Sequence, residues 1–189
     1  MTNDDRVFFE LAPMGKAPWV TLAALLLAAP LVLVAIDQFA PDESVAPGAL
    51  ALTVLITVAI FVALALVMRR RSVLLEHGQL VVRAAFYTRR VALAAIDLEQ
   101  ARAVDLREHK QFRPCLKTNG FALPGFWAGH FRDREKHRLF VLSTSQKVLI
   151  LPLEDGSRLL LGPARPLAML KALQDRARSS KNTTSGGAG

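Results

Sequence analysis

The chain has 189 residues, of which 52% are apolar and 21% are charged, so its composition is that of a folded protein and excludes a disordered chain. Its net charge of +8 is unevenly distributed, because acidic residues outnumber basic ones before residue 69 and basic residues dominate after it. Cys115 is the only cysteine, which excludes an intrachain disulfide bond and any zinc site made of several cysteines. The parts of the chain before and after residue 69 are therefore expected to have different environments.

Two long uncharged runs dominate the first part of the chain. Neither the run from Trp19 to Ile36 nor the run from Gly48 to Met68 contains a charged residue. A helix of about 20 apolar residues crosses the hydrocarbon core of a bilayer, whereas two soluble core helices this apolar would have no face for water. We therefore predict transmembrane helices over residues 17–39 and 48–68, the first of them kinked at Pro30. A cleaved signal peptide is the alternative for the first run, but acidic residues precede it where such a peptide has basic ones.

The charges beside these two runs predict an orientation. The connection over residues 40–47 contains acidic residues and no basic one, whereas Lys16 precedes the first run and three arginines follow the second. Basic residues accumulate on the cytoplasmic side of a membrane. We expect a multi-pass protein of the plasma membrane with residues 1–16 and both termini in the cytoplasm, and with residues 40–47 as a short acidic external loop.

From residue 69 onward the apolar residues form short segments separated by turn residues, which predicts a mainly-β domain over residues 69–178. His77-Gly78 and Thr144-Ser145-Gln146 are each expected to join a pair of neighbouring strands. The expected strands are residues 72–76, 79–86, 91–96, 101–106, 138–143, 147–153 and 158–161.

A helix is predicted to follow these strands. Pro166 is suited to its first turn, and its end is expected near Arg178. Its buried face is expected to comprise Leu167, Leu170, Leu173 and Ala177. The polar, glycine-rich residues 179–189 are predicted to be a disordered tail.

A motif lies in the middle of the β domain. Residues 113–125 read R-P-C-L-K-T-N-G-F-A-L-P-G, and Gly129 and Phe131 follow. The pattern R-P-x-L-x-T-N-G-x-x-L-P-G resembles the signature of the bacterial pleckstrin-homology-like (PH-like) domain family of small membrane proteins, and the likeness extends over residues 72–175. It implies a two-helix transmembrane hairpin followed by a mainly-β PH-like barrel with a C-terminal capping α-helix, in the bacterial inner membrane. Cys115 stands where the family pattern has a small residue such as glycine, and the resemblance implies no catalytic residue and no cofactor.

No pattern in the sequence predicts catalysis, metal binding or nucleotide binding. The four histidines lack the spacing of a metal-binding pair, and neither a glycine-rich phosphate loop nor a nucleophile elbow occurs. Cys115 lies near Arg113 and Lys117, which would favour a reactive thiolate, but a lone cysteine is more often a small buried apolar residue. The sequence lacks an aromatic strand of the RNA-binding type. We therefore expect a protein that is not an enzyme, needs no cofactor and no metal, and does not bind nucleic acid.

Basic and aromatic residues are interleaved between Arg107 and Arg134. This mixture suits anionic lipid headgroups or an acidic protein partner, whereas the alternative is that the aromatic side chains fill the core and the charges face water. The short His77-Gly78 turn leaves no room for the phosphoinositide-binding loop of eukaryotic PH domains. The candidate residues for binding a ligand or the membrane surface are Arg69, Arg70, Arg71, Arg113, Lys117, Asn119, Trp127 and Arg132.

These expectations combine into a non-catalytic binding or scaffolding module anchored in the inner membrane. Its expected partners are membrane lipids, a protein partner or a second copy of the chain. The alternative is a structural subunit of a larger membrane complex for transport, secretion or envelope assembly, because alanine-rich helices can pack against other membrane helices.

Overall fold

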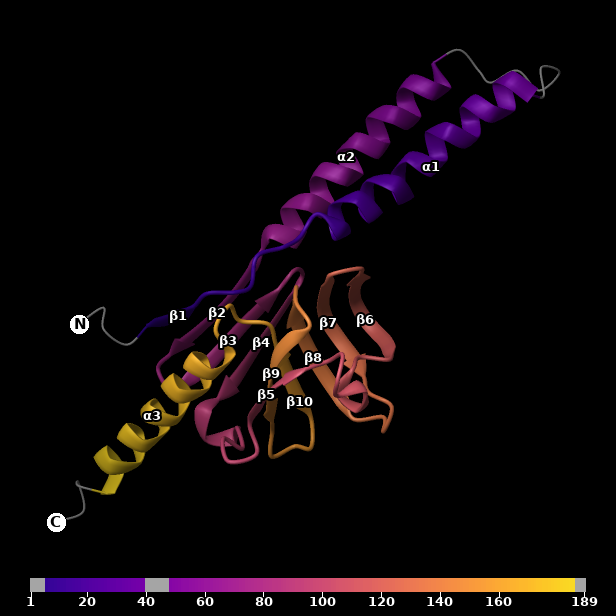
Figure 1. Cartoon of the computed structure of the whole chain (residues 1–189). Coiled ribbons are helices and arrows are strands. Elements are labelled where there is room, and N and C mark those ends of the chain that lie inside the picture. The colour runs from indigo at the N-terminus through magenta and orange to yellow at the C-terminus, as the bar shows by residue number, and fades with distance from the viewer. Residues whose placement is uncertain (1–5, 40–47, 186–189) are drawn as a thin grey trace. The chain divides into compact units, whose positions relative to one another are not determined.

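The structure is a computed structural model that describes residues 6–39 and 48–185 of the chain, with the backbone alone for residues 181–185. The chain divides into two compact units, whose elements are labelled in Figure 1. The helical unit comprises residues 15–69. The β unit combines the residues up to Met14 with the residues from Arg70 onward.

The helical unit consists of α1 (Ala17–Phe39) and α2 (Ala49–Arg69). Both helices are long and apolar enough to cross a membrane, as the sequence predicts. Leu25 in α1 and Leu55 in α2 are 67% and 66% exposed, and continuous apolar surface of this kind is normally covered by protein or lipid. The expected external loop over residues 40–47 lies outside the described residues.

Four antiparallel strands form the first sheet of the β unit, in the order β1-β2-β3-β4. They are β1 (Val7–Phe9), β2 (Arg71–Glu76), β3 (Gln79–Ala84) and β4 (Tyr87–Ala92). His77 and Gly78 join β2 to β3 with positive φ angles of 48° and 69°, as expected for a tight hairpin turn.

Two strand predictions in this sheet are wrong. The strand expected over residues 79–86 ends at Ala84, because Ala85 and Phe86 form a second hairpin turn before β4. This turn has no glycine or asparagine, so the sequence carries no signal for it. The strand expected over residues 91–96 is replaced by the end of β4 and a short 3₁₀ helix, η3 (Leu93–Ala95).

The segment before α1 belongs to the β unit. β1 pairs with β2, so that Val7 lies opposite Leu75 and Phe9 opposite Val73. Beyond β1, the Ala12 N–H donates to the Gly162 carbonyl at 3.0 Å. The strands on either side of the two apolar helices are therefore neighbours in one sheet.

The second sheet has six strands in the order β5-β9-β10-β8-β7-β6. They are β5 (Arg102–Asp105), β6 (Leu116–Leu123), β7 (Phe126–Arg132), β8 (Arg138–Ser143), β9 (Lys147–Pro152) and β10 (Arg158–Leu161). A 3₁₀ helix, η4 (Lys110–Phe112), lies between β5 and β6.

The expected hairpin around Thr144-Ser145-Gln146 is wrong, because β10 lies between β8 and β9. β10 pairs in parallel with β8 and antiparallel with β9. Leu159, Leu160 and Leu161 of β10 are all 0% exposed. A strand that is apolar on both faces is best buried in the interior of a sheet, which explains this order.

In the part of the chain that the structure describes, the strands form two sheets and no closed barrel. β4 and β6 are edge strands of the first and second sheet. Side chains join the two sheets near these edges, because Tyr87 of β4 lies against Gly129 and His130 of β7. The barrel that the family resemblance implies is therefore replaced by two sheets packed through their side chains.

The second sheet buries apolar side chains on both faces. Phe131, Leu139 and Ile150 belong to a cluster on one face, and Phe112 of η4 covers them. Strand alternation places Phe126 and Phe140 on the other face, and both are fully buried.

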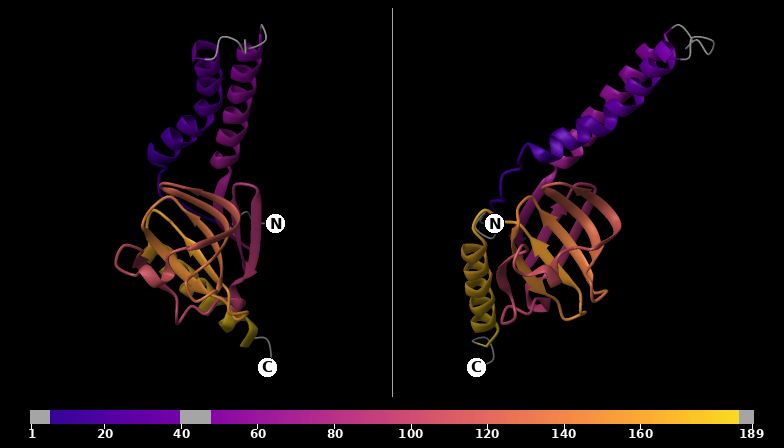
Figure 2. Two further views of the ribbon diagram at one scale, coloured as in Figure 1. Left: turned by 90° about the vertical axis from the view of Figure 1, so that its right-hand side faces the viewer. Right: turned by 45° about the vertical axis from the view of Figure 1, so that its right-hand side comes forward.

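α3 (Pro166–Ser185) contacts β5, β9 and η3 and runs beside the strands of the β unit (Figure 2). It begins at Pro166 as predicted, but it continues past the expected end near Arg178 and includes the first residues of the expected disordered tail. Its buried side chains are Met169 and Leu173, whereas Leu167 is 72% exposed. The buried stripe is therefore rotated from the predicted one, and residues 186–189 lie outside the described residues.

Candidate anion-binding site

Two arginines lie opposite each other on neighbouring strands. In the antiparallel register of β7 and β8, Arg132 pairs with Arg138 and His130 pairs with Phe140. Both arginines are exposed, and among the described residues neither has a carboxylate within ion-pair distance. Like charges directly opposite each other in a sheet repel. This end of the β7–β8 pair therefore carries two like charges, of which Arg138 is partly balanced by the charge of Asp155.

A third arginine comes from the first sheet. The Arg89 guanidinium of β4 donates to the Ser157 hydroxyl at 2.8 Å and lies 3.5 Å from the Asp155 carboxylate. Asp155 and Ser157 belong to the turn between β9 and β10, where the Ser157 hydroxyl donates to Asp155 at 2.5 Å. The Arg89 side chain is 23% exposed. The turn therefore holds Arg89 in one place.

A cavity of about 430 Å³ connects these groups. Guanidinium groups bind phosphate and carboxylate groups through paired N–H donors, and Asp155, the one carboxylate among the described lining residues, already pairs with Arg89. The cavity therefore has the chemistry of an anion site. Its polar lining includes Arg89, Asn119, His130, Arg132, Arg138 and Ser157.

Two glycines of the motif make room for one wall of the site. Gly120 and Gly129 pair across β6 and β7, and a Cβ on Gly129 would lie 3.1 Å from the Tyr87 ring. Without that side chain Tyr87 reaches β6, where its hydroxyl donates to Asn119 Oδ1 at 2.5 Å. Tyr87 thus holds the Asn119 side chain at the cavity.

A β-bulge adjusts the same strand. The register of β6 shifts between Lys117 and Asn119, and the hydroxyl of the intervening Thr118 donates to the His130 carbonyl at 2.9 Å. The extra residue changes which side chains of β6 face the cavity.

His130 is the residue of the cavity that would respond to an anion. Its ring makes edge-to-face contacts with Tyr87 and Phe140, with centroids 5.6 and 5.0 Å apart. Although His130 is exposed overall, partial burial of its ring lowers its pKa below the ordinary value of 6.5, and the charge of Arg89 lowers it further. The lowered pKa favours the neutral ring at pH 7.

The pKa of the Asp155 carboxyl group is lowered, which favours its charged form and its ion pair with Arg89. Hydrogen bonds from the Ser157 hydroxyl and N–H lower the pKa of Asp155 below its usual range. Asp155 is therefore charged at neutral pH and keeps its partner Arg89 oriented.

Of the residues that the sequence singles out between 107 and 134, the structure brings Asn119 and Arg132 together in this cavity. Arg113 lies elsewhere, with its guanidinium 5.8 Å from the centre of the Trp127 ring. Trp127 packs against the cluster on the face of β7 opposite His130. Lys117 is exposed on β6 and does not line the cavity.

The three arginines after the apolar runs have different surroundings. Arg69 is the last residue of α2. Arg70 is exposed, and its carbonyl accepts a hydrogen bond from Ala85. Arg71 is half-buried in β2, where it donates to the Ala12 carbonyl at 2.9 Å, and burial lowers its pKa. Arg71 therefore fastens the N-terminal segment to the rest of the β unit.

Sequence reasoning missed Arg89, His130 and Arg138 as site residues. One signal was available, because a turn over residues 133–137 would place Arg132 opposite Arg138 in a hairpin. Arg89 had no such signal, since its place at the cavity depends on the packing of one sheet against the other.

Most phenylalanine side chains between Arg107 and Arg134 are part of the hydrophobic core. Phe112, Phe126 and Phe131 are buried. For these three the alternative reading, in which the aromatic side chains fill the core, is confirmed.

A larger cavity of about 530 Å³ has mixed charge. Its lining includes the carboxylates of Asp97, Glu99 and Glu154 as well as Arg102 and Arg158. The guanidinium groups of both arginines lie over the Phe112 ring, 4.8 and 5.5 Å from its centre. This lining favours neither an anion nor a cation.

The turn between β7 and β8 contains a cluster of possible metal ligands, Asp133, Glu135 and His137, whose donor atoms lie within 4.8 Å of one another. The buried Asp133 carboxylate already accepts hydrogen bonds from Arg158 at 3.0 Å and from the His137 N–H at 2.8 Å. These bonds explain the cluster as a network that stabilises the turn.

Comparisons of this chain with protein-family models, with curated proteins and with solved structures found no match.

Proposed function

We propose that this protein is a membrane-anchored, non-catalytic binding module whose β unit holds an anionic group between Arg89, Arg132 and Arg138. The observation that carries the proposal is the Arg132–Arg138 pair, in which two positive charges lie opposite each other and line one cavity with Arg89. A phosphate or carboxylate group between them would replace their repulsion with charge-assisted hydrogen bonds.

The pairing of β1 with β2 supports the membrane anchor. β1 precedes α1 and β2 follows α2, so both ends of the helix pair return to one folded unit. Helices that span a membrane with this connection form a hairpin whose two ends lie on the same side. The arginines after α2 and the acidic residues 40–47 favour the cytoplasmic side of a bacterial inner membrane for the β unit. The PH-like motif over residues 113–125 is in keeping with this arrangement.

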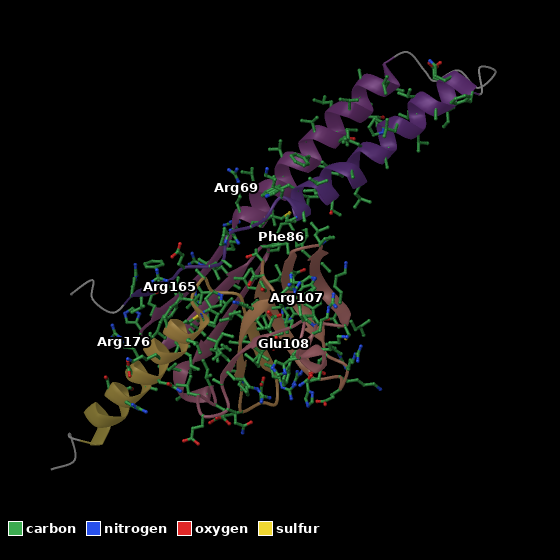
Figure 3. The ribbon with its side chains drawn as sticks, viewed as in Figure 1. Arg69, Phe86, Arg107, Glu108, Arg165 and Arg176 are labelled. Atoms are coloured by element: carbon green, nitrogen blue, oxygen red, sulfur yellow. The ribbon has the colours of Figure 1, made fainter. Side chains whose placement is uncertain are left out.

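The chemistry of the cavity suits an anionic lipid headgroup and an acidic group of a protein partner alike. The test that separates them is purification of the intact chain from its native membrane in a gentle detergent, followed by mass spectrometry of bound lipids and proteins. The site variant R132Q/R138Q removes the paired charges. The matched control R107Q/K110Q removes the same charge from the segment before β6, outside the cavity, where Arg107 is labelled in Figure 3.

We expect an anionic lipid or an acidic protein to copurify with the native chain and the control, and to be lost from R132Q/R138Q. Retention of the same molecules by all three chains would contradict the proposed site. The exposed apolar surface of α1 and α2 favours a second candidate function, a structural subunit of a larger membrane complex. That function predicts a protein at fixed stoichiometry that remains bound to R132Q/R138Q.

A labelling experiment tests the orientation. Cys115 is exposed, so the expectation that it is a small buried residue is wrong, and it serves as the native reporter for the β unit. Glu43→Cys in a Cys115→Ser chain reports on the connection between the helices. A membrane-impermeant maleimide should label the Glu43→Cys chain in intact cells, and Cys115 only after permeabilisation. Labelling of Cys115 in intact cells would show that the β unit faces outward.

A further inference from the structure

The turn between β3 and β4 is an apolar tip. Ala84 pairs with Tyr87, so the turn consists of Ala85 and Phe86. Ala85 adopts a φ of 55°, a conformation that favours glycine or asparagine. Turns that face water are rich in glycine, asparagine, aspartate, serine and proline, yet Phe86 is 64% exposed here. Ala85 is buried, so the apolar surface that this tip exposes is the Phe86 ring.

The exposed ring is held in place from within the β unit. Phe86 stacks on Phe121 of β6, with ring centroids 5.8 Å apart and planes inclined by 27°. Phe121 in turn lies 6.3 Å from the ring of Phe126, which is buried. Phe86 is thus the outermost of three neighbouring aromatic rings, and Figure 3 labels it at the tip of the hairpin.

The tip is bonded to the residue that follows α2. The Ala85 N–H donates to the Arg70 carbonyl at 3.0 Å, and α2 ends at Arg69. In the next position of the register, Arg71 pairs with Ala84. One peptide bond therefore separates the last residue of an apolar helix from the residue that binds the turn, and this holds for any angle between that helix and the β unit.

We propose that the Ala85-Phe86 turn, backed by Phe121, inserts into the headgroup region of the bilayer and attaches the β unit directly to the lipid surface. The inference rests on the proposed function, because it requires α2 to span a membrane. Phenylalanine is among the apolar residues that membrane-surface segments bury at the boundary between headgroups and acyl chains. The positive charges of Arg69 and Arg70 attract anionic headgroups to the same level. Phe86 is the residue that enters the lipid.

The test uses tryptophan as a depth reporter in the full chain. Trp19→Phe and Trp127→Phe remove the native tryptophans, and Phe86→Trp supplies the reporter. The protein is reconstituted into vesicles of phosphatidylethanolamine and phosphatidylglycerol, with or without bromine atoms on the acyl chains. We expect the emission of Phe86→Trp to shift to shorter wavelength and to lose most of its intensity in the brominated vesicles.

Two matched reporters make the result decisive. Leu116 is 60% exposed and pairs with Arg132, near the end of β6 away from Phe121, so Leu116→Trp should emit as in water and escape quenching. Leu55→Trp lies within α2 and should be quenched if the helix spans the membrane.

The outcomes separate the inference from the function on which it rests. Quenching of Leu55→Trp with water-like emission of Phe86→Trp would overturn the lipid contact and leave the membrane anchor intact. Equal quenching of Phe86→Trp and Leu116→Trp would overturn the assignment of the contact to this turn. Absence of quenching at Leu55→Trp would overturn the membrane anchor itself, and the lipid contact with it.

Discussion

The ring of Tyr87 lies against Gly129, where a Cβ would be 3.1 Å from the ring and still closer to the backbone of Asn119 and Gly120. This contact joins β4 of one sheet to β7 of the other. It also lets the Tyr87 hydroxyl reach Asn119 at the edge of the basic cavity. A local feature of the motif, an absent side chain, therefore positions residues of both sheets around the candidate site.

Gly129→Ala should destabilise the β unit by about 2–4 kcal/mol. Gly129 has a φ of 119°, which strains any other residue by about 1–3 kcal/mol. The new methyl group would also clash with the backbone of Asn119 and Gly120 and press on the Tyr87 ring. Urea unfolding followed by tryptophan fluorescence measures the change. Gly78→Ala is the control, because Gly78 has a φ of 69° with open space around it and should show a cost for strain alone of about 1–2 kcal/mol. Equal costs for the two variants would contradict the packing role of Gly129.

Arg138→Gln should weaken anion binding with little change in stability. The variant removes the repulsion from Arg132 and also the attraction between Arg138 and the Asp155 carboxylate, so its free energy of unfolding should change by less than about 1 kcal/mol. The same variant should lose the stabilisation that inorganic phosphate confers on the native chain. Thermal unfolding with and without phosphate measures both effects. Identical phosphate responses of the native chain and Arg138→Gln would remove Arg138 from the site.

The pKa of His130 should report on the state of the cavity. Because burial and Arg89 lower this pKa in the folded protein, protonation of the ring opposes folding. The corresponding stability is present above the ordinary pKa of about 6.5 and is lost as the pH falls through the lower pKa of the folded state. Titration of the His130 ring by NMR should show a rise in pKa on Arg89→Gln, which removes a nearby positive charge, and on addition of phosphate. The exposed His77 is the control, and equal phosphate-induced shifts at both histidines would point to a general effect of the anion.

Arg71→Met should loosen the N-terminal segment. Arg71 and the Thr144 hydroxyl both donate to the Ala12 carbonyl, at 2.9 and 2.7 Å. Loss of a partly buried hydrogen bond to a charged group costs about 1.5–3 kcal/mol. Hydrogen–deuterium exchange should therefore become faster in Val7–Phe9 and remain unchanged in the buried Arg158–Leu161. The control is Arg70→Met, which changes an exposed neighbour and should leave the hydrogen–deuterium exchange of β1 unchanged. Unchanged exchange of β1 in Arg71→Met would show that strand pairing holds the segment without Arg71.

Local patterns in the sequence were enough to predict several elements. The uncharged runs predicted α1 and α2 because only a helix satisfies its own backbone in so apolar a segment. His77-Gly78 predicted a turn through its glycine, and Pro166 predicted the start of α3. The Ala85-Phe86 turn was missed because it lacks the usual turn residues. Its contacts are instead with Arg70 and Phe121, which are not its neighbours in the sequence.

The sequence by itself determined the presence of two apolar helices, a basic and mainly-β second part, and a C-terminal helix, since each depends on charge or on periodicity within a short stretch. Only the tertiary structure decided that β1 joins β2, that β10 separates β8 from β9, and that Arg89 meets Arg132 and Arg138. These relationships connect residues far apart in the chain. They depend on which buried surfaces and backbone hydrogen bonds can be satisfied together, and no local pattern contains that information.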